Sequence, residues 1–523
     1  MFNEFVGVKA FSCQSINVVY FTSLYISERL ATDCERFLHA SAVGNVRKNI
    51  GPMTLAMRTQ LPYIADSTRV FESVADLPWA SFLDSGRHGK AASRFDFIVA
   101  EPYVSLITRG PLTEVHRQGE EVLRLTEDPF VLIRRYLDIN PAFGSDLPFS
   151  GGALGYFAYD LARRIEKLPS IASIVDPIPD MAIGIYDWAL VVDHEEKKSW
   201  LVGHGRDPQT KLKWERLIHL LTHPAPQSNR MPFVRHSGVE SSFTRERYVQ
   251  AFEQIQRYIK AGDCYQVNLA QRFSAQVSGD PWLAYQRLRC MNPAPFSAYL
   301  STPSATILST SPESFLSVHK GLVQTKPIKG TRPRSGQESM DLERIWELKH
   351  SEKDQAENVM IVDLLRNDLA KNCVPGSIKV PSLFQVESFE TVHHLVSTVT
   401  GQLQAGRDAI DLLREAFPGG SITGAPKLRA MQIIEALEGI RRGLYCGAIG
   451  YIGFDGDMQT NIAIRTVTIN AGQANFWAGG GIVADSVESK EYEESFDKAR
   501  ALLNFLDSVD TNLYSSSSLK AIQ

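Results

Sequence analysis

The stretch Cys446–Val483, CGAIGYIGFDGDMQTNIAIRTVTINAGQANFWAGGGIV, contains three runs of strand-forming residues separated by short turns. It predicts strands over 445–455, 460–470 and 474–484. Because the connections are too short to hold a helix, we expect consecutive strands to pair as antiparallel neighbours. The stretch therefore favours an α+β fold with antiparallel sheets over a doubly wound α/β fold.

The rest of the chain follows the same pattern, with strands in pairs and runs. SRFDFIVAEPYVSLIT and MAIGIYDWALVVDH have the composition of strands, and further strands are predicted over 264–275, 295–301, 305–310 and 314–318. A helix is predicted in TRERYVQAFEQIQRYIKAG, where Gly262 is placed to end it. Other helices are predicted over 340–370, 408–416, 426–438 and 488–507.

Composition excludes several classes of protein. The 523 residues are 44% hydrophobic and 22% charged, as in ordinary globular proteins. A net charge of -4, from 55 basic and 59 acidic residues, leaves no basic footprint for nucleic acid. No apolar run approaches the ~18 residues that span a membrane. The six cysteines are widely spaced without a CxxC pair, which predicts free thiols in a reducing compartment such as the cytoplasm.

Shifts in composition suggest four regions. We expect residues 1–52 to be an N-terminal extension, because Met53 is a plausible alternative start. Residues 53–225 would form an N-terminal region and 243–507 a catalytic domain. The Pro- and Ser-containing stretch between them, 222–242, would be a linker, and 508–523 a flexible tail.

Two glutamates lie on predicted helices. Glu357 shares a helical face with Met360, Ile361 and Leu364, and a carboxylate there needs a cation, a metal or a proton. Glu494 lies on a helix with two apolar sides and has Lys498 four residues later. Both are open to an ion-pair interpretation. If the two met in space, they would suit Mg²⁺, which takes a few carboxylates together with water and substrate oxygens.

Two glycine-rich segments are candidates for ligand contact. FPGGSITGAPKLRAM contains Ser421 before a helix with Pro426 in its first turn, where exposed N–H groups would suit an anion. Gly479–Gly481 would allow close backbone approach to a ligand. Neither matches a nucleotide-binding motif, and a turn or a bulge is an equally good interpretation.

Arg465 occurs in the strand-forming run TNIAIRTVTI. Strand alternation predicts that it points to the same side as Asn461, Ala463 and Val467. An arginine there either pairs with a buried acid or receives an anionic ligand, and the run does not separate the two.

Lys329 lies at the centre of TKPIKGTRPR, close to three other cations: Lys326, Arg332 and Arg334. Like charges disfavour protonation, so we expect a lowered pKa and a nucleophilic or basic amine. The alternative is a solvated surface lysine. Glu313 precedes it by one predicted hairpin, which would bring the two together.

Taken in order, these motifs resemble the chorismate-utilising enzymes, the family of anthranilate synthase component I. The resemblance rests on GDCYQVNLAQRF, STSPESF, PIKGTRPR, AENVMIVDLLRND, VHHLVSTV, FPGGSITGAPKLRAM, CGAIGYIGF, IAIRTV, AGGGIVADS and YEESFDKA. These motifs run from about 263 to 500. Through LPWASFLDSG, SRFDFIVAEP and MAIGIYDWALVVDH the resemblance to one branch of the family extends over about Leu77 to Leu506. It implies large antiparallel sheets packed as a sandwich with helices outside.

The resemblance also implies roles for the site residues. Lys329 marks the branch that forms 4-amino-4-deoxychorismate, because similar anthranilate synthases have alanine there. It would attack C2 of chorismate while Glu313 protonates the departing hydroxyl, and His394 would assist proton transfer. Glu357 and Glu494 would bind Mg²⁺. Substrate contacts would come from Ser421, Tyr445, Arg465, Gly479, Gly480, Gly481 and Lys498.

The family's amino-acid pocket maps onto Ser85, Ser93, Arg94, Phe95, Pro295, Phe296 and Ser297, and relatives of this branch can hold tryptophan there. The chain has no Gly-x-Cys-x-Gly elbow of a glutamine amidotransferase, so a separate subunit would supply ammonia. Alternatives are anthranilate synthase component I, an isochorismate or salicylate synthase, and a non-catalytic glutaminase-binding subunit.

Overall fold

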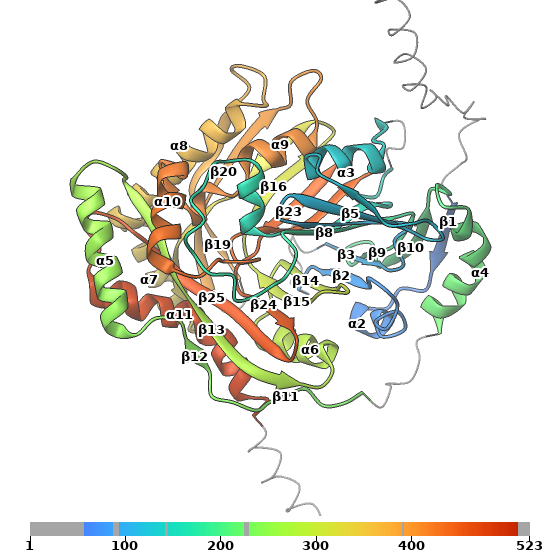
Figure 1. Ribbon diagram of the computed structural model, residues 1–523, viewed down its shortest axis with the longest axis horizontal. Helices are drawn as coiled ribbons and strands as arrows, with labels where there is room; N and C mark the ends of the chain where they lie inside the picture. Colours follow the sequence, from blue (N-terminus) through green and yellow to red (C-terminus); the bar gives the residue numbers. More distant parts are fainter. Residues whose placement is uncertain (1–56, 87–93, 142–144, 224–229, 390–391, 511–523) are drawn as a thin grey trace, which may run out of the picture. The chain divides into compact units, whose positions relative to one another are not determined.

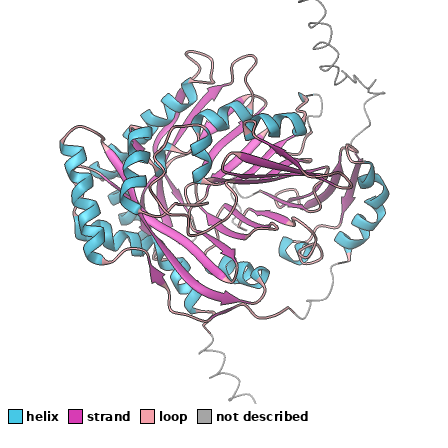
Figure 2. Ribbon diagram, in the orientation of Figure 1, coloured by secondary structure: helices cyan, strands magenta, loops and turns pink. Residues whose placement is uncertain are grey.

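Two large antiparallel sheets form the framework of the protein (Figures 1 and 2). The computed structural model describes residues 57–86, 94–141, 145–223, 230–389 and 392–510, all within one compact unit, Leu55–Gln523. The predicted extension, 1–52, lies outside the described residues, as does most of the predicted tail. The other predicted domain boundaries stay predictions, although both sheets combine strands from before and after the predicted linker.

The first sheet has 13 strands, which come from both the N-terminal and the C-terminal region of the chain. In order along the sheet they are β1 (Met57–Leu61), β10 (Lys198–Gly203), β9 (Trp188–Asp193), β3 (Phe95–Val99), β2 (Ser81–Asp84), β14 (Phe296–Ser301), β15 (Thr306–Ser311), β24 (Thr466–Asn470), β25 (Gln473–Ile482), β13 (Gln266–Ser278) and β11 (Val234–Arg235). Two short strands, β12 (Glu240–Ser241) and β21 (Gly424–Ala425), also pair with β13.

The second sheet has 12 strands. In order they are β18 (Ile328–Pro333), β20 (Val392–Gln402), β17 (Leu322–Thr325), β16 (Ser314–His319), β23 (Met458–Ile462), β22 (Ala448–Gly453), β7 (Gly152–Phe157), β8 (Met181–Tyr186), β4 (Val104–Arg109), β5 (Leu112–Arg117) and β6 (Leu123–Leu125), with β19 (Lys379–Ser388) beside β20.

The helices flank the sheets (Figure 2). They are α2 (Ser67–Phe71), α3 (Pro129–Leu137), α4 (Pro208–Thr222), α5 (Arg245–Lys260), α6 (Pro281–Met291), α7 (Glu338–Lys349), α8 (Glu352–Ala370), α9 (Ala409–Ala416), α10 (Lys427–Glu438) and α11 (Glu488–Asp507). Two short 3₁₀ turns, η3 (Tyr159–Arg164) and η4 (Gly420–Ile422), complete the set. None of the described helices is long and apolar enough to cross a membrane.

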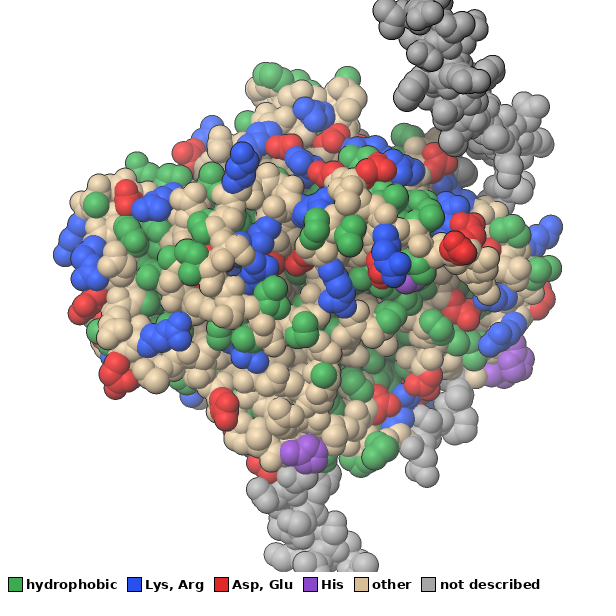
Figure 3. Space-filling model, viewed as in Figure 1, with side chains coloured by type: hydrophobic (Ala, Val, Ile, Leu, Met, Phe, Trp, Pro, Cys, Tyr) green, Lys and Arg blue, Asp and Glu red, His purple; other side chains and the backbone are tan. Residues whose placement is uncertain are grey.

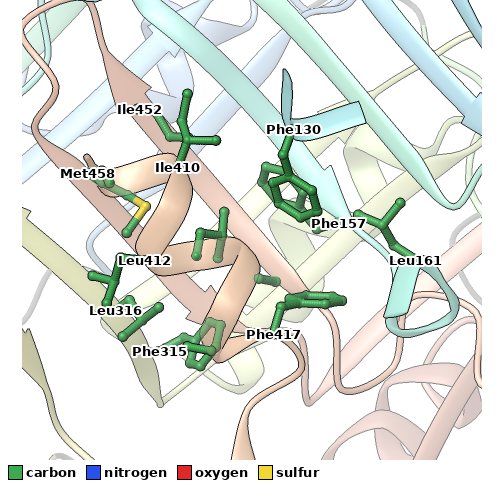
Figure 4. Packing of buried hydrophobic residues seen from close by; sticks show 14 of the residues in the cluster. Phe130, Phe157, Leu161, Phe315, Leu316, Ile410, Leu412, Phe417, Ile452 and Met458 are labelled. Carbon is green, nitrogen blue, oxygen red and sulfur yellow. The ribbon is translucent and has the colours of Figure 1, made fainter. Parts of the chain in front are cut away.

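Four apolar clusters hold the described sheets and helices together, one of them formed by α5 and α10 against β13. The cluster between the sheets joins Phe97 and Ile307 of the first sheet to Tyr156 and Tyr451 of the second. Outside the second sheet, helices α3 and α9 pack on Phe157, Phe315 and their neighbours, as Figure 4 shows for Phe130, Ile410 and Leu412. Outside the first sheet, α2, α6 and α11 form the remaining cluster. The sandwich of antiparallel sheets with helices outside is therefore confirmed.

Several predicted elements needed correction. The helix predicted over 340–370 is two helices, because Ser351 caps a new one by accepting a hydrogen bond from the Asp354 amide. The strand predicted over 460–470 is interrupted before Arg465, which has a φ of 49°. The segment PIKGTRPR has the proline and glycine content of a loop, but it contains the edge strand β18.

The outer surface agrees with the near-neutral composition. On the face that Figure 3 shows, basic and acidic side chains are interspersed, so no large area carries a single sign. The cysteines among the described residues, Cys264, Cys290, Cys373 and Cys446, are free thiols.

Close strand packing around Gly450 gives a test of the second sheet. Gly450 of β22 lies opposite Thr460 of β23 and Gly155 of β7. A Cβ atom there would lie 2.0 Å from the Gln459 carbonyl oxygen. We expect Gly450→Ala to destabilise the protein by roughly 1–3 kcal/mol, since overpacking forces the strands apart. Gly238→Ala is the control, because a Cβ at Gly238 meets nothing within 4 Å. Equal urea midpoints for the two variants would contradict this packing.

Candidate active site

Glu313 lies between β15 and β16, at the centre of the candidate site. Its side chain is buried, and its Oε1 accepts a hydrogen bond from the Ser421 hydroxyl at 3.0 Å. Burial raises the pKa of Glu313, and the opposing effects of Lys329 and of the Ser421 bond do not cancel it. Glu313 can therefore hold a proton closer to neutral pH than an ordinary glutamate, as a general acid must.

Lys329 projects from the edge strand β18. The pairing of β18 with β20 shifts register between Lys329 and Thr331, and Gly330 has a φ of 75° at this irregularity. A bulge of this kind redirects neighbouring side chains. The Lys329 amine donates a hydrogen bond to the Ser421 carbonyl oxygen at 3.3 Å. The hairpin β16–β17 thus brings Lys329 and Glu313 to the same site, as the sequence predicted.

The pKa of Lys329 is lowered, but the predicted cause was wrong. Burial lowers it, and the negative charges of Glu357 and Glu313 act in the opposite direction. The loop cations that were expected to lower it each have an acidic partner: Lys326 with Glu387, Arg332 with Glu347 and Asp354, and Arg334 with Asp341. Desolvation is therefore the main cause that favours the neutral amine, and the one like charge that adds to it is that of Lys498 rather than of the neighbouring loop cations.

His394 lies on β20 directly opposite Thr331. Its Nδ1 is 2.8 Å from the Thr331 hydroxyl. Burial lowers the pKa of His394 to about 3, with smaller contributions from Arg465 and His393. The ring is therefore neutral at physiological pH, so it can accept a proton only from a strongly acidic group.

Arg465 does not follow strand alternation as predicted, because it lies in the irregular connection between β23 and β24. No ion pair joins it to an acid within the described part of the chain, and burial lowers the pKa of its guanidinium. Of the two interpretations that the sequence left open, this favours an anionic ligand. Tyr445, also buried, stacks on Trp477 with ring centroids 5.9 Å apart.

The glycine run lies within β25, inside the strand predicted over 474–484. At Gly479 a Cβ would lie 2.2 Å from the Leu269 carbonyl oxygen, so only glycine fits against β13. At Gly480 a Cβ would lie 3.2 Å from Glu491 Oε2 and 3.5 Å from Glu494 Oε1. The absence of side chains therefore brings two carboxylates of α11 against the strand.

A second acidic group comes from α8. Lys353 bridges the two helices, with its amine 3.8 Å from Glu357 Oε1 and 3.6 Å from Glu491 Oε1. Burial raises the pKa of Glu357. Burial also acts to raise the pKa of Glu494, but its ion pair with Lys498, at 2.6 Å, lowers the pKa overall. Lys498 also donates to the Gly479 carbonyl oxygen at 3.1 Å.

The structure adds Glu491 and Lys353 to the residues that the sequence singled out. Each occurs one helical turn from a predicted site residue: Glu491 three before Glu494, and Lys353 four before Glu357. That spacing was the available signal. Glu357, Glu491 and Glu494 are the carboxylates that could hold a divalent cation. No cluster of three or more metal-ligating side chains occurs in the described ranges, so a bound cation would need oxygens from water or substrate.

A cavity of 440 Å³ lies beside the site. Ser85, Arg94, Phe95, Pro295, Phe296 and Ser297 of the predicted amino-acid pocket all line it, whereas Ser93 lies outside the described residues. Pro312 and Ser314 flank Glu313 and face this cavity, and so does Ile328, the neighbour of Lys329. The cavity is therefore lined by the chain segments around β16 and β18 that also carry Glu313 and Lys329.

Comparison with known proteins agrees with this geometry. The chain matches the family described as chorismate binding enzyme over residues 89–504. It is 48% identical over 452 residues to aminodeoxychorismate synthase component 1 of Klebsiella aerogenes, which covers 86% of this chain and 98% of the relative. It is 50% identical over 440 residues to the protein of the same name from Escherichia coli K12, which covers 84% and 95%.

Among solved structures, anthranilate synthase component I from Streptococcus pneumoniae TIGR4 has the same fold, with a TM-score of 0.71. It is 31% identical in sequence, and the match covers 79% of this chain and 93% of that chain. The identity is lower than to the two relatives above.

The neutral His394 predicts a pH dependence of stability. Its pKa is about 3 in the folded protein and about 6.5 when unfolded, so protons bind preferentially to the unfolded chain. The stability from this group is present above pH 6.5 and is lost as the pH falls towards 3. Between pH 7 and pH 5 we expect a loss of about 2 kcal/mol from His394 alone. In urea denaturation, the free energy of unfolding of His394→Gln should fall by about 2 kcal/mol less than that of the wild type between pH 7 and pH 5. An equal fall in both proteins would contradict a buried neutral ring.

Proposed function

The chain belongs to the chorismate binding enzyme family, and on this basis we propose that it is the chorismate-aminating component of an aminodeoxychorismate synthase. It would convert chorismate and ammonia to 4-amino-4-deoxychorismate, for 4-aminobenzoate and folate synthesis. One observation carries the proposal: a desolvated lysine, Lys329, lies beside Glu313, and lysine is the residue that the resemblance implies for this branch. The greater identity to aminodeoxychorismate synthases also supports it.

The reaction would proceed in two displacements. First, the neutral Lys329 amine forms a bond to C2 of chorismate, both conjugated ring double bonds shift by one position, and the C4–O bond breaks. Glu313 gives its proton to the departing hydroxyl, which leaves as water. Second, ammonia forms a bond to C4, both double bonds shift back, and the C2–N bond breaks to release the neutral Lys329 amine. The new ammonium group at C4 returns one proton to Glu313. Splitting one substitution into two easier ones is the general advantage of covalent catalysis.

The binding groups suit a substrate with two carboxylates. Arg465 would receive the enolpyruvyl carboxylate, because no acid pairs with it among the described residues and a guanidinium can bind it through two bonds. Ser421, Tyr445 and the Gly479–Gly481 backbone would contact the ring and its substituents. Lys498 lies near enough to add positive charge.

Glu357 and Glu494 would hold Mg²⁺, with Glu491 beside them. The fit rests on the gathering of these carboxylates at Gly480 and Lys353. When bound, Mg²⁺ would supply positive charge that orients the ring carboxylate of chorismate. Carboxylates together with substrate oxygens are its usual ligands.

Partners follow from the same proposal. A glutamine amidotransferase subunit, component II, would supply ammonia, which agrees with the name component 1 of the relatives. The 440 Å³ cavity would hold tryptophan, supported by its mixture of aromatic, serine and arginine side chains. A cytoplasmic location is supported by the free thiols of the described cysteines.

Removal of the nucleophile gives the central test. With chorismate, ammonium and Mg²⁺, the wild-type protein should form 4-amino-4-deoxychorismate, and Lys329→Ala should lose at least 100-fold in rate, roughly the effect of removing a catalytic side chain. Mass spectrometry should detect a lysine adduct only when Lys329 is present. Lys211→Ala, on the exposed face of α4, is the matched control and should retain full activity.

Two results would overturn the proposal in different ways. Anthranilate or isochorismate as the wild-type product would assign the chain to another branch. If the wild type forms the expected product but no Lys329 adduct is detected, and Lys329→Ala keeps its activity, the covalent step is wrong.

The carboxylates of α8 and α11 predict the metal dependence. Glu357→Gln should weaken the affinity for Mg²⁺ at least tenfold, because one of few anionic ligands is lost. Isothermal titration calorimetry with Mg²⁺ and chorismate measures this directly. Glu352→Gln, at the exposed start of the same helix, is the control. Equal affinities in the two variants would exclude Glu357 from the metal site.

A further inference from the structure

We propose that the buried ion pair Glu438–Arg442 is a positioning device that fixes three substrate-contacting elements relative to one another. The inference rests on the proposed function, because it concerns the same chorismate site. Glu438 is the last residue of α10, Arg442 follows four residues later, and each is 2% exposed. Neither touches the expected substrate position itself, so they act through their neighbours.

The pair is held rigidly. Glu438 Oε1 accepts hydrogen bonds from Arg442 at 2.7 Å and from the Ala270 amide of β13 at 2.9 Å. Glu438 Oε2 accepts from Arg442 Nε at 2.9 Å. The bidentate pairing orients the planar guanidinium, which leaves its remaining N–H groups pointing in fixed directions.

The first of these directions leads to Ser421. Arg442 donates to the Ile422 carbonyl oxygen at 3.1 Å. Ile422 directly follows Ser421, whose hydroxyl binds Glu313 and whose carbonyl oxygen binds the Lys329 amine. Arg442 therefore binds the residue next to Ser421, and Ser421 is the residue that contacts both the proposed acid, Glu313, and the proposed nucleophile, Lys329.

The second direction leads to the glycine run. Arg442 donates to the Asn268 carbonyl oxygen at 2.9 Å. With its amide oxygen turned towards Arg442, the Asn268 side chain also accepts a bond at 3.2 Å and donates to the Gly480 carbonyl oxygen at 3.2 Å. Asn268 also faces Gly481 in the pairing of β13 and β25.

The third contact of Arg442 is with two tyrosine rings. The Arg442 guanidinium carbon lies 5.4 Å from the ring centroid of Tyr445 and 5.0 Å from that of Tyr159. These are cation–π distances, and they fix the ring that stacks on Trp477. The Arg442 guanidinium thus contacts Ile422, which follows Ser421, Asn268, which binds Gly480, and the ring of Tyr445 itself.

A stability role alone does not account for this arrangement. A buried ion pair contributes little net stability compared with well-packed apolar residues. The chain offers a comparison one turn earlier on the same helix. Glu435 is also buried, pairs with Arg163, and accepts bonds from the amides of Ile171 and Ala172 at 2.8 and 2.9 Å. It has similar burial and bonding, but its partners lie on a segment without proposed substrate contacts.

Three variants separate positioning from stability. Arg442→Lys keeps the charge opposite Glu438 but cannot reach Ile422 and Asn268 together. Asn268→Ser removes the side-chain bonds to Gly480 and Arg442 but leaves the Glu438–Arg442 ion pair and the bond from Arg442 to the main-chain carbonyl oxygen of residue 268 intact. Glu435→Gln is the matched control for loss of a buried charge on α10. Readouts are the melting temperature, chorismate affinity by calorimetry, and kcat and KM with their pH profiles.

We expect Arg442→Lys to lower kcat at least tenfold. It should also move the loss of activity that follows ionisation of Glu313 to a higher pH, because a displaced Ser421 no longer lowers the pKa of Glu313. Asn268→Ser should weaken chorismate binding about tenfold, the effect of one lost hydrogen bond to the site, and leave the Glu313 ionisation in the pH profile unchanged. Glu435→Gln should lower only the melting temperature.

Other outcomes overturn the inference. If Arg442→Lys and Asn268→Ser change only the melting temperature, as the control does, the pair is structural. If Arg442→Lys does not fold, Asn268→Ser with unchanged affinity is sufficient to reject the inference. A wild-type protein that binds chorismate but forms another product would reject the proposed function and leave the affinity test of this inference valid.

Discussion

Desolvation of the Lys329 amine is the constraint on which the site depends. An ammonium group removed from water loses solvation energy that nearby carboxylates restore only in part, so its pKa falls although Glu357 and Glu313 oppose the fall. The same burial raises the pKa of Glu313. Amine and acid therefore approach a neutral pair, which is the protonation state that a nucleophile and a proton donor both need. The position of Lys329 at a bulge in an edge strand allows this, because β18 is covered by α7 and α8.

The two sheets explain how residues far apart in sequence reach one place. The acid Glu313 lies in the connection between β15 of the first sheet and β16 of the second, Lys329 lies on β18 of the second sheet, and β25 of the first sheet carries the glycine run. The cavity that matches the amino-acid pocket contacts the strands on either side of Glu313 and Lys329. A ligand in that cavity would therefore press on the backbone that orients both residues, since packed interiors transmit small displacements.

Much of the fold could be predicted from local patterns, and the failures have local causes. The strands predicted over 445–455 and 474–484 and the helix over 488–507 follow from local composition and periodicity, whereas the strand predicted over 460–470 is two strands, β23 and β24. Ser351 with Asp354 three residues later is a capping signal that would have divided the helix predicted over 340–370. The proline and glycine content of PIKGTRPR suggests a loop, but edge strands tolerate both. The partners of the loop cations come from α7, α8 and β19, and no local pattern shows such contacts, so the predicted cause of the lowered lysine pKa was wrong.

Charge balance within the site supports a divalent cation. If Lys329 and Glu313 approach neutrality together, three carboxylates remain against three cations: Glu357, Glu491 and Glu494 against Lys353, Lys498 and Arg465. The described part of the site is thus close to neutral before any substrate enters. The chorismate of the proposed function would bring two carboxylates, and an uncompensated excess of two negative charges in a partly desolvated site is unfavourable. Arg465 can bind one carboxylate, but its charge is already counted in this balance. One Mg²⁺ at the α8 and α11 carboxylates would offset both charges, which is why metal and substrate should bind together rather than independently.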